Sequence, residues 1–150
     1  MSVTVEVFVE AKRLFTSEAW AAEIRAHGFE LEVDSFNPKT HSGFLPCRLR
    51  GEACGFEYFY KRVADLDLSD EPDLEEAYQR RCVAAGSRDV IVSFVTRSSM
   101  VDAASAAIAA SVLTAVCDGM LSVEGDEPAI TGEEALDWAR GVEHDAGAAT

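Results

Sequence analysis

The feature that most constrains the fold is an apolar stretch in the second half of the chain. Residues 89–96 (DVIVSFVT) are almost entirely apolar over the length of one strand, which predicts a central strand covered on both faces. Residues 100–117 follow after two serines and are rich in alanine, which predicts a helix. Because small side chains let a helix approach a sheet closely, we expect this helix to pack on the central strand.

A membrane span is the alternative interpretation of residues 100–117. Their 18 residues stand at the lower limit for crossing a bilayer, and they include Asp102 and several hydroxyl side chains. Acidic residues follow the stretch, so it lacks the positive charges that anchor a span at the membrane surface. We therefore predict a buried helix and no contact with a membrane.

Strand and helix patterns fill the rest of the chain. Valines alternate with polar residues over residues 3–10, which predicts a first strand with its valines on the core face. Further strands are predicted at residues 29–34, 44–49, 54–63 and 120–123. The second and third of these form a hairpin that turns within residues 50–53. Helices are predicted to begin at Thr16, Pro72 and Thr131, where capping hydroxyls or a proline mark helix starts.

These elements predict a single α+β domain over residues 1–145 and a frayed tail at residues 146–150. The sheet is expected to be mixed but mostly antiparallel, with five or six strands packed against about four helices. A chain of 150 residues, of which 48% are hydrophobic, is long and apolar enough to bury a substantial core.

The cysteines and the N-terminus indicate a reducing compartment. The chain begins without a secretory signal pattern, and its four cysteines include no C-x-x-C pair. We therefore expect a cytoplasmic protein whose thiols stay reduced and behave as small apolar side chains. A disulfide between Cys47 and Cys54, across the predicted hairpin, is the alternative.

Charge is distributed unevenly along the chain. Residues 1–63 hold nine acids and eight bases, a net charge of −1, whereas residues 64–150 hold eighteen acids and five bases, a net charge of −13. Seven acids and no base fall within residues 65–76. Binding to nucleic acid or to anionic lipid is not expected, because both need a positive surface. The acidic half predicts either a solvated face or a surface that binds a basic protein.

Residues 65–76 also resemble a calcium-binding loop. Side chains with oxygen atoms occupy the first, third, fifth, ninth and twelfth positions, as in such a loop. Asp70 stands where the loop needs a glycine, however, and Pro72 follows two residues later. We therefore interpret the segment as an acidic loop before a helix, where acids favour the positive end of the helix dipole.

A cysteine nucleophile is the second chemical alternative. Cys54 would need a base such as His41 to form its thiolate. The cysteine and histidine spacings match no zinc pattern, and the sequence contains no nucleophile elbow, phosphate-binding loop or H-E-x-x-H motif. We therefore assign no catalytic residue, no metal and no cofactor. A small enzyme or small-molecule-binding protein that uses Cys54 and His41 remains an alternative.

Aromatic residues suggest two anchors for a partner. Phe56, Tyr58 and Tyr60 alternate along one strand, so they form either a core face or an exposed strip. Trp138 lies on the last predicted helix near acidic residues and is expected to be half-buried. Because tyrosine and tryptophan often dominate binding energy at interfaces, Tyr58 and Trp138 are the candidate anchors.

Several short segments resemble those of the small bacterial immunity proteins that neutralise polymorphic toxins. They are Trp20, His27-Gly28-Phe29, Gly43-Phe44-Leu45-Pro46, Gly55-Phe56-Glu57, Asp118-Gly119 after the alanine-rich helix, and the segment that begins at Thr131. The resemblance implies a non-catalytic binder that covers the active site or substrate surface of a toxin. It carries over no functional residue, since such proteins diverge at their contact surfaces.

Charge and resemblance together give a functional hypothesis. We expect the protein to inhibit a basic toxin domain that acts on nucleic acid, by binding it through an acidic surface. The candidate contact residues are Asp67, Asp70, Glu71, Asp73, Glu75, Asp126 and Glu127, with Tyr58 and Trp138 as anchors. A self-associating structural or accessory subunit is a further alternative, and the sequence leaves the oligomeric state open.

Overall fold

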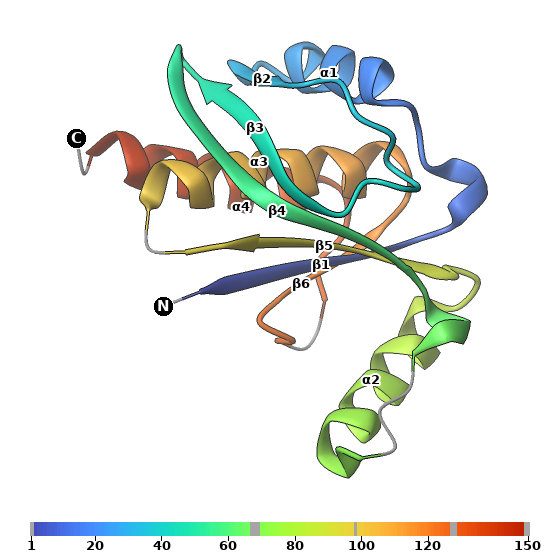
Figure 1. Ribbon diagram of the computed structural model, residues 1–150. Helices are drawn as coiled ribbons and strands as arrows, with labels where there is room; N and C mark the ends of the chain where they lie inside the picture. Colours follow the sequence, from blue (N-terminus) through green and yellow to red (C-terminus); the bar gives the residue numbers. More distant parts are fainter. Residues whose placement is uncertain (1, 67–69, 98, 127–128, 149–150) are drawn as a thin grey trace.

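A six-stranded sheet forms the centre of the fold, with the strand order β2-β3-β4-β5-β1-β6 (Figure 1). The computed structural model describes residues 2–66, 70–97, 99–126 and 129–148. The strands are β1 (Val3–Val9), β2 (Leu31–Val33), β3 (Gly43–Leu49), β4 (Glu52–Arg62), β5 (Val90–Thr96) and β6 (Met120–Val123). β5 lies between β4 and β1, so the apolar stretch forms a central strand as predicted, although its second face is covered only in part, with Ser93 and Val95 half-buried.

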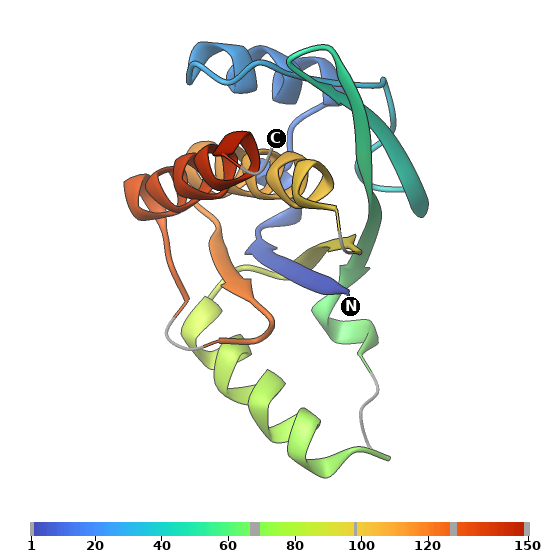
Figure 2. The same ribbon diagram turned by 90° about the vertical axis from the view of Figure 1, so that its left-hand side faces the viewer.

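Within the described residues, four α-helices cover the two faces of the sheet unequally (Figures 1 and 2). The helices are α1 (Ser17–Ala26), α2 (Pro72–Ala85), α3 (Met100–Val116) and α4 (Gly132–Ala148), with the short 3-10 helices η1 (Ala11–Arg13) and η2 (Val63–Asp65). Helices α1, α3 and α4 contribute to the main core on one face, whereas α2 packs on the other. The predicted α+β class is therefore confirmed.

All strand pairs of the described sheet are antiparallel, which goes further than the mostly antiparallel sheet expected from the sequence. Helix α3 connects β5 to β6, and a strand–helix–strand connection commonly brings two parallel strands together. β1 lies between these two strands and pairs with both, so that Val5 is opposite Phe94 and Val123. The inserted strand separates β5 from β6 and makes both pairings antiparallel.

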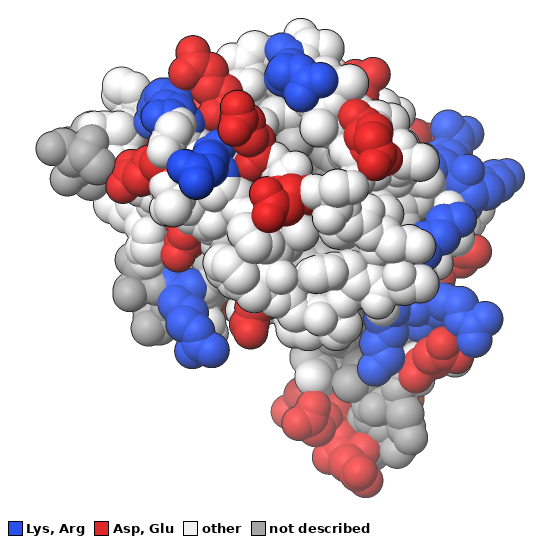
Figure 3. All heavy atoms as spheres, turned by 45° about the horizontal axis from the view of Figure 1, so that its top comes forward, with Lys and Arg blue, Asp and Glu red and all other residues white. Residues whose placement is uncertain are grey.

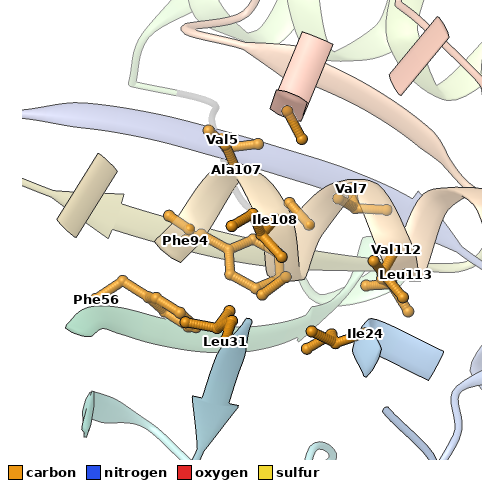
Figure 4. Close-up of a cluster of buried hydrophobic side chains, with 14 of the residues drawn as sticks. Val5, Val7, Ile24, Leu31, Phe56, Phe94, Ala107, Ile108, Val112 and Leu113 are labelled. Atoms are coloured by element: carbon orange, nitrogen blue, oxygen red, sulfur yellow. The ribbon is translucent and has the colours of Figure 1, made fainter. Parts of the chain in front are cut away.

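Helix α3 lies between the sheet and α4, and α1 packs beside α3 and reaches the sheet itself, where Trp20 contacts the Tyr58 and Phe94 rings. Every side chain from Ala104 to Thr114 is buried, and Ile108 packs near Phe94 at the centre of the cluster in Figure 4. Its buried hydroxyls donate to carbonyl oxygens three or four residues earlier, at 2.7–3.0 Å; they belong to Ser105, Ser111 and Thr114. Among the described residues, no helix combines the length and apolar character that crossing a membrane requires.

The hairpin of β3 and β4 turns at Arg50 and Gly51, a tighter turn than the predicted residues 50–53. Both residues have positive φ, 49° and 82°, as a two-residue turn that matches the twist of the strands requires. Cys47 lies opposite Cys54 in the strand register, yet both thiols are free. The hairpin therefore holds its register through the turn and side-chain packing, without a disulfide.

The ends of the helices follow local signals, with one extension at the C-terminus. The Thr16 side chain accepts a hydrogen bond from the Ala19 amide at 3.1 Å and caps α1. Ser99 caps α3 in the same way through the Asp102 amide, at 3.3 Å. Helix α4 continues through residue 148, and Ala146 is only 2% exposed. Residues 146–148 of the expected frayed tail are therefore helical, and Ala146 packs into the core.

Two glycines provide a matched test of the packing. A Cβ atom on Gly55 would lie 2.6 Å from the Leu45 carbonyl oxygen and 2.5 Å from the Phe44 ring, whereas one on Gly141 of α4 meets nothing within 4 Å. We expect Gly55→Ala to lower the free energy of unfolding by about 1–3 kcal/mol. Gly141→Ala should raise it by about 0.5–1 kcal/mol, because alanine favours a helix. Urea unfolding measures both, and equal stabilities of the two variants would contradict the close approach at Gly55.

Candidate partner-binding surface

Helix α2 extends away from the face of the sheet opposite α3 (Figures 1 and 2). Pro72 occupies its first turn, where the fixed φ of proline suits a helix start, and Gly86 follows its last turn with a φ of 63°. The buried side chains of α2 are Arg81 and Ala85, both in its C-terminal half. The N-terminal half therefore projects beyond the sheet.

A small apolar cluster attaches the C-terminal half of α2 to the sheet. Ala85 packs with Phe8 of β1, Ile91 of β5 and Met120 of β6, all of which are buried. The Arg88 guanidinium donates to the Ala85 carbonyl oxygen at 3.1 Å, which satisfies a carbonyl at the end of the helix. This end of α2 is therefore fixed to three strands.

A buried ion pair sets the orientation of α2 on the sheet. Glu6 of β1 and Arg81 are 8% and 5% exposed, and Arg81 Nη2 lies 3.7 Å from Glu6 Oε1. The Tyr78 hydroxyl donates a hydrogen bond to the other carboxylate oxygen, and the guanidinium stacks over the Tyr78 ring at 4.2 Å. Arg81 Nη1 also donates to the Gly125 carbonyl oxygen at 3.2 Å. The Glu6 carboxylate thus has two partners on α2, and the same arginine connects the helix to the turn after β6.

The projecting part of α2 and the residues just before it carry most of the candidate acids. Asp70, Glu71 and Asp73 are exposed, and no ion pair joins any of them to another described residue. Glu75 is half-buried and accepts a hydrogen bond from Gln79 Nε2 at 3.3 Å. In Figure 3, acidic side chains gather at the end of the projection, whereas acids and bases are interspersed over the body. The negative charge of this tip is therefore open to a partner.

The second acidic segment lies nearer the base of α2. Asp126 is exposed in the turn after β6, next to Gly125, whose carbonyl oxygen binds Arg81. Arg81 is nine residues from the start of α2, which corresponds to roughly 13 Å along the helix axis. The structure thus places both acidic segments beside α2, one at its N-terminal tip and the other near its attached C-terminal half. Asp67 and Glu127 lie outside the described residues.

The two aromatic candidates do not lie at the acidic tip. Tyr58 is fully buried, donates to the Pro38 carbonyl oxygen at 2.6 Å and packs edge-on against Phe94. It has no surface to offer a partner, so we remove it from the candidate anchors. Trp138 is half-buried on α4, in the helical layer on the opposite face of the sheet from α2. Neither side chain belongs to the surface formed by α2.

The structure does not bring Cys54 and His41 together. Burial raises the pKa of the Cys54 thiol, which is the opposite of the lowered pKa that activates a cysteine nucleophile. His41 Nε2 lies 3.1 Å from the Phe44 carbonyl oxygen, and its ring packs against Phe36 and Tyr58. Tyr58 is four residues from Cys54 along β4, about 13 Å in an extended strand. Both side chains therefore serve packing.

The resemblance to a calcium loop gains no support from the described residues. Asp65 Oδ2 accepts a hydrogen bond from Arg62 Nε at 2.9 Å, and Glu76 Oε1 lies 3.6 Å from Arg80 Nη1. The first and last positions of the pattern are thus paired with bases. No group of three or more potential metal ligands occurs within the described residues, and the middle of the pattern lies outside them.

Sequence reasoning missed the residues that position α2. The alternation in the first strand places Glu6 on the face opposite the valines, and nothing local indicates that a helix covers it. The spacing of Tyr78, Arg81 and Ala85 at three- and four-residue intervals is a signal for one stripe facing the sheet. An arginine within that stripe is the clue that an acid lies opposite.

Comparison of the chain with protein-family models, with curated protein sequences and with solved structures gives no match. The surface around α2 has three parts, which are the acidic tip, the attached C-terminal half and the buried ion pair between them.

Removal of the buried cation should destabilise the protein. Arg81→Ala leaves the Glu6 carboxylate buried without its positive partner, so we expect the free energy of unfolding to fall by about 3 kcal/mol. Arg81→Ala in a Glu6→Gln background should cost clearly less, because the buried charge is gone. Arg62→Ala, which breaks the exposed pair with Asp65, serves as the control and should leave stability nearly unchanged. Equal losses for Arg81→Ala and Arg62→Ala would contradict the ion pair at the base of α2.

Alkaline pH should loosen the same contact. Burial, together with the hydrogen bond to Glu6, raises the pKa of Tyr78 to about 12. The folded state therefore holds the phenol proton more tightly than the unfolded chain, whose tyrosines titrate near 10. This contribution to stability is complete below about pH 10 and is lost as the pH rises towards 12. Tyr78→Phe should make the decline in unfolding free energy shallower over that range, whereas an unchanged slope would be evidence against the shift.

Proposed function

We propose that this protein is a non-catalytic inhibitor that binds a basic protein partner through the acidic tip of α2, with the turn after β6 at its side. One observation carries the proposal. Asp70, Glu71 and Asp73 are exposed at the end of a projecting helix, and no described base neutralises them. Concentrated charge on a projecting element is well placed to steer an approaching partner of opposite charge.

The partner class that we propose is a toxin domain that acts on nucleic acid. Such domains present basic clefts to their substrates, and an acidic helix offers a complementary surface. The resemblance of the sequence to bacterial immunity proteins supports the same class. We place this activity in the cytoplasm, which agrees with four free cysteines.

Helix capping alone does not account for the whole acidic tip. Asp73 and Glu75 lie in the first turn of α2, where acids stabilise the positive end of the helix dipole. Asp70 and Glu71 precede the helix, and Glu71 at the N-cap makes no side-chain capping bond. These two charges stand ahead of the helix in addition to the two acids of its first turn, and this concentration favours a role in binding.

Charge reversal at the tip should slow association with the partner. We expect the triple variant Asp70→Lys, Glu71→Lys, Asp73→Lys to lower the association rate by about 10- to 100-fold at low salt, because electrostatic steering is lost. The rate for the unmodified protein should fall as ionic strength rises, and the variant should show a weaker salt dependence. Biolayer interferometry against the product of the adjacent gene and a panel of basic nuclease and deaminase domains measures both.

A second triple variant separates local charge from net charge. Glu30→Lys, Glu32→Lys and Glu52→Lys change the net charge of −14 by the same amount, on exposed residues of β2, its flank and the β3–β4 hairpin. This variant should retain most of the association rate. If both triple variants associate with a verified partner as fast as the unmodified protein, the tip is only a solubilising surface and the proposal is wrong.

A further inference from the structure

We infer that the groove between α2 and η2 receives an apolar side chain from a basic segment of the partner. This inference rests on the proposed function and assigns the anchor that the acidic tip itself lacks. The groove has a volume of about 480 Å³, within the range of pockets that enclose a small ligand or a large side chain. Its lining residues are Val63, Leu66, Glu75, Tyr78, Gln79, Cys82 and Val83.

The two walls of the groove are apolar and come from two elements. Val63 of η2 and Leu66 just after it form one wall, and Tyr78 and Cys82, one helical turn apart, form the other. All four are partly buried against the small cluster at the base of α2. Val83 stands at the rim with 84% of its surface exposed. An apolar side chain in the groove would cover surface that α2 leaves open to water.

The charge around the groove favours a basic occupant. Glu75 is the only charged residue among the described residues that line it. Glu71 precedes Glu75 by four residues, a spacing that places the two acids on the same side of the helix end. Arg62, the base nearest to Val63 in the sequence, is held by Asp65 at 2.9 Å. A lysine or arginine beside the inserted side chain would therefore meet acids at the rim.

The same charges disfavour a second copy of this chain as the occupant. Each copy carries a net charge of −14, so two copies would repel each other as α2 approached α2. A basic segment with one apolar residue satisfies both the walls and the rim. The two features then affect different rate constants. The acids mainly raise the association rate, and the groove mainly lowers the dissociation rate.

Cys82 provides a probe inside the groove. It is partly exposed, whereas Cys47, Cys54 and Cys117 are buried, so N-ethylmaleimide should modify Cys82 first. We would measure this reaction by mass spectrometry with two peptides of equal charge, a heptapeptide of lysines with a central leucine and the same peptide with a central alanine. At matched concentrations and low salt, the leucine peptide should slow the reaction at least threefold more than the alanine peptide. Equal protection by the two peptides, or none by either, overturns the groove as an apolar site.

Two valine variants test the groove with a whole partner protein. Val83→Ser should raise the dissociation rate about tenfold, because two methyl groups at the rim lose their buried contact. Val116→Ser, on the exposed end of α3, is the matched control and should leave the rate unchanged. Both valines are exposed at helix surfaces, at 84% and 39%, so neither variant threatens folding.

The outcomes of these experiments distinguish failure of the groove from failure of the proposed function. A partner whose association depends on the acidic tip, but whose dissociation is the same for Val83→Ser and Val116→Ser, overturns the groove and leaves the function standing. If no basic domain binds the unmodified protein, the proposed function fails, and the anchor that rests on it fails too. Protection of Cys82 in the complex, with a faster dissociation of Val83→Ser, supports both.

Discussion

The close approach of α3 to the sheet is the constraint on which the rest of the structure depends. Alanine at most inward positions brings the helix backbone near β4, β5 and β1, and its buried hydroxyls are satisfied within the helix. Larger apolar side chains on the strands, such as Phe94 and Phe56, fill the remaining space. Helices α1 and α4 then pack against α3 and complete this layer.

Helices α1, α3 and α4 cover one face of the sheet, and among the described α-helices only α2 packs on the other. The cluster beneath α2 is small, and a buried ion pair contributes orientation more than stability. Half of the helix is therefore free of packing requirements. Acids that would repel one another in a packed element are tolerated there because water surrounds them. The division of α2 into an attached half and a projecting half makes a concentrated charge compatible with a stable fold.

Elements with a strong local pattern are predictable from the sequence alone. A continuous apolar run followed by an alanine-rich helix has few alternatives, so β5 and α3 follow from composition. The burial of Glu6 and Arg81 does not, because it requires α2 to fold back over β1 from a distant part of the chain. Alternation along β4 defines two faces but does not say which one is covered, so Tyr58 is equally consistent with core and surface. The exposure of Asp70 follows from its acidic neighbours, whereas its distance from Asp126 depends on the tertiary arrangement of α2.

The position of β1 between β5 and β6 has a consequence for the order in which the protein folds. β1 pairs with strands that lie after residue 89, whereas β3 and β4 pair across a two-residue turn. Pairings between distant segments close long loops and form slowly. During synthesis β1 stays unpaired and its valine-rich face stays exposed until residues 90–123 have left the ribosome. The hairpin of β3 and β4 is able to form earlier. The main core is thus completed late, and until then the unpaired edges of β1 are open to pairing with another chain.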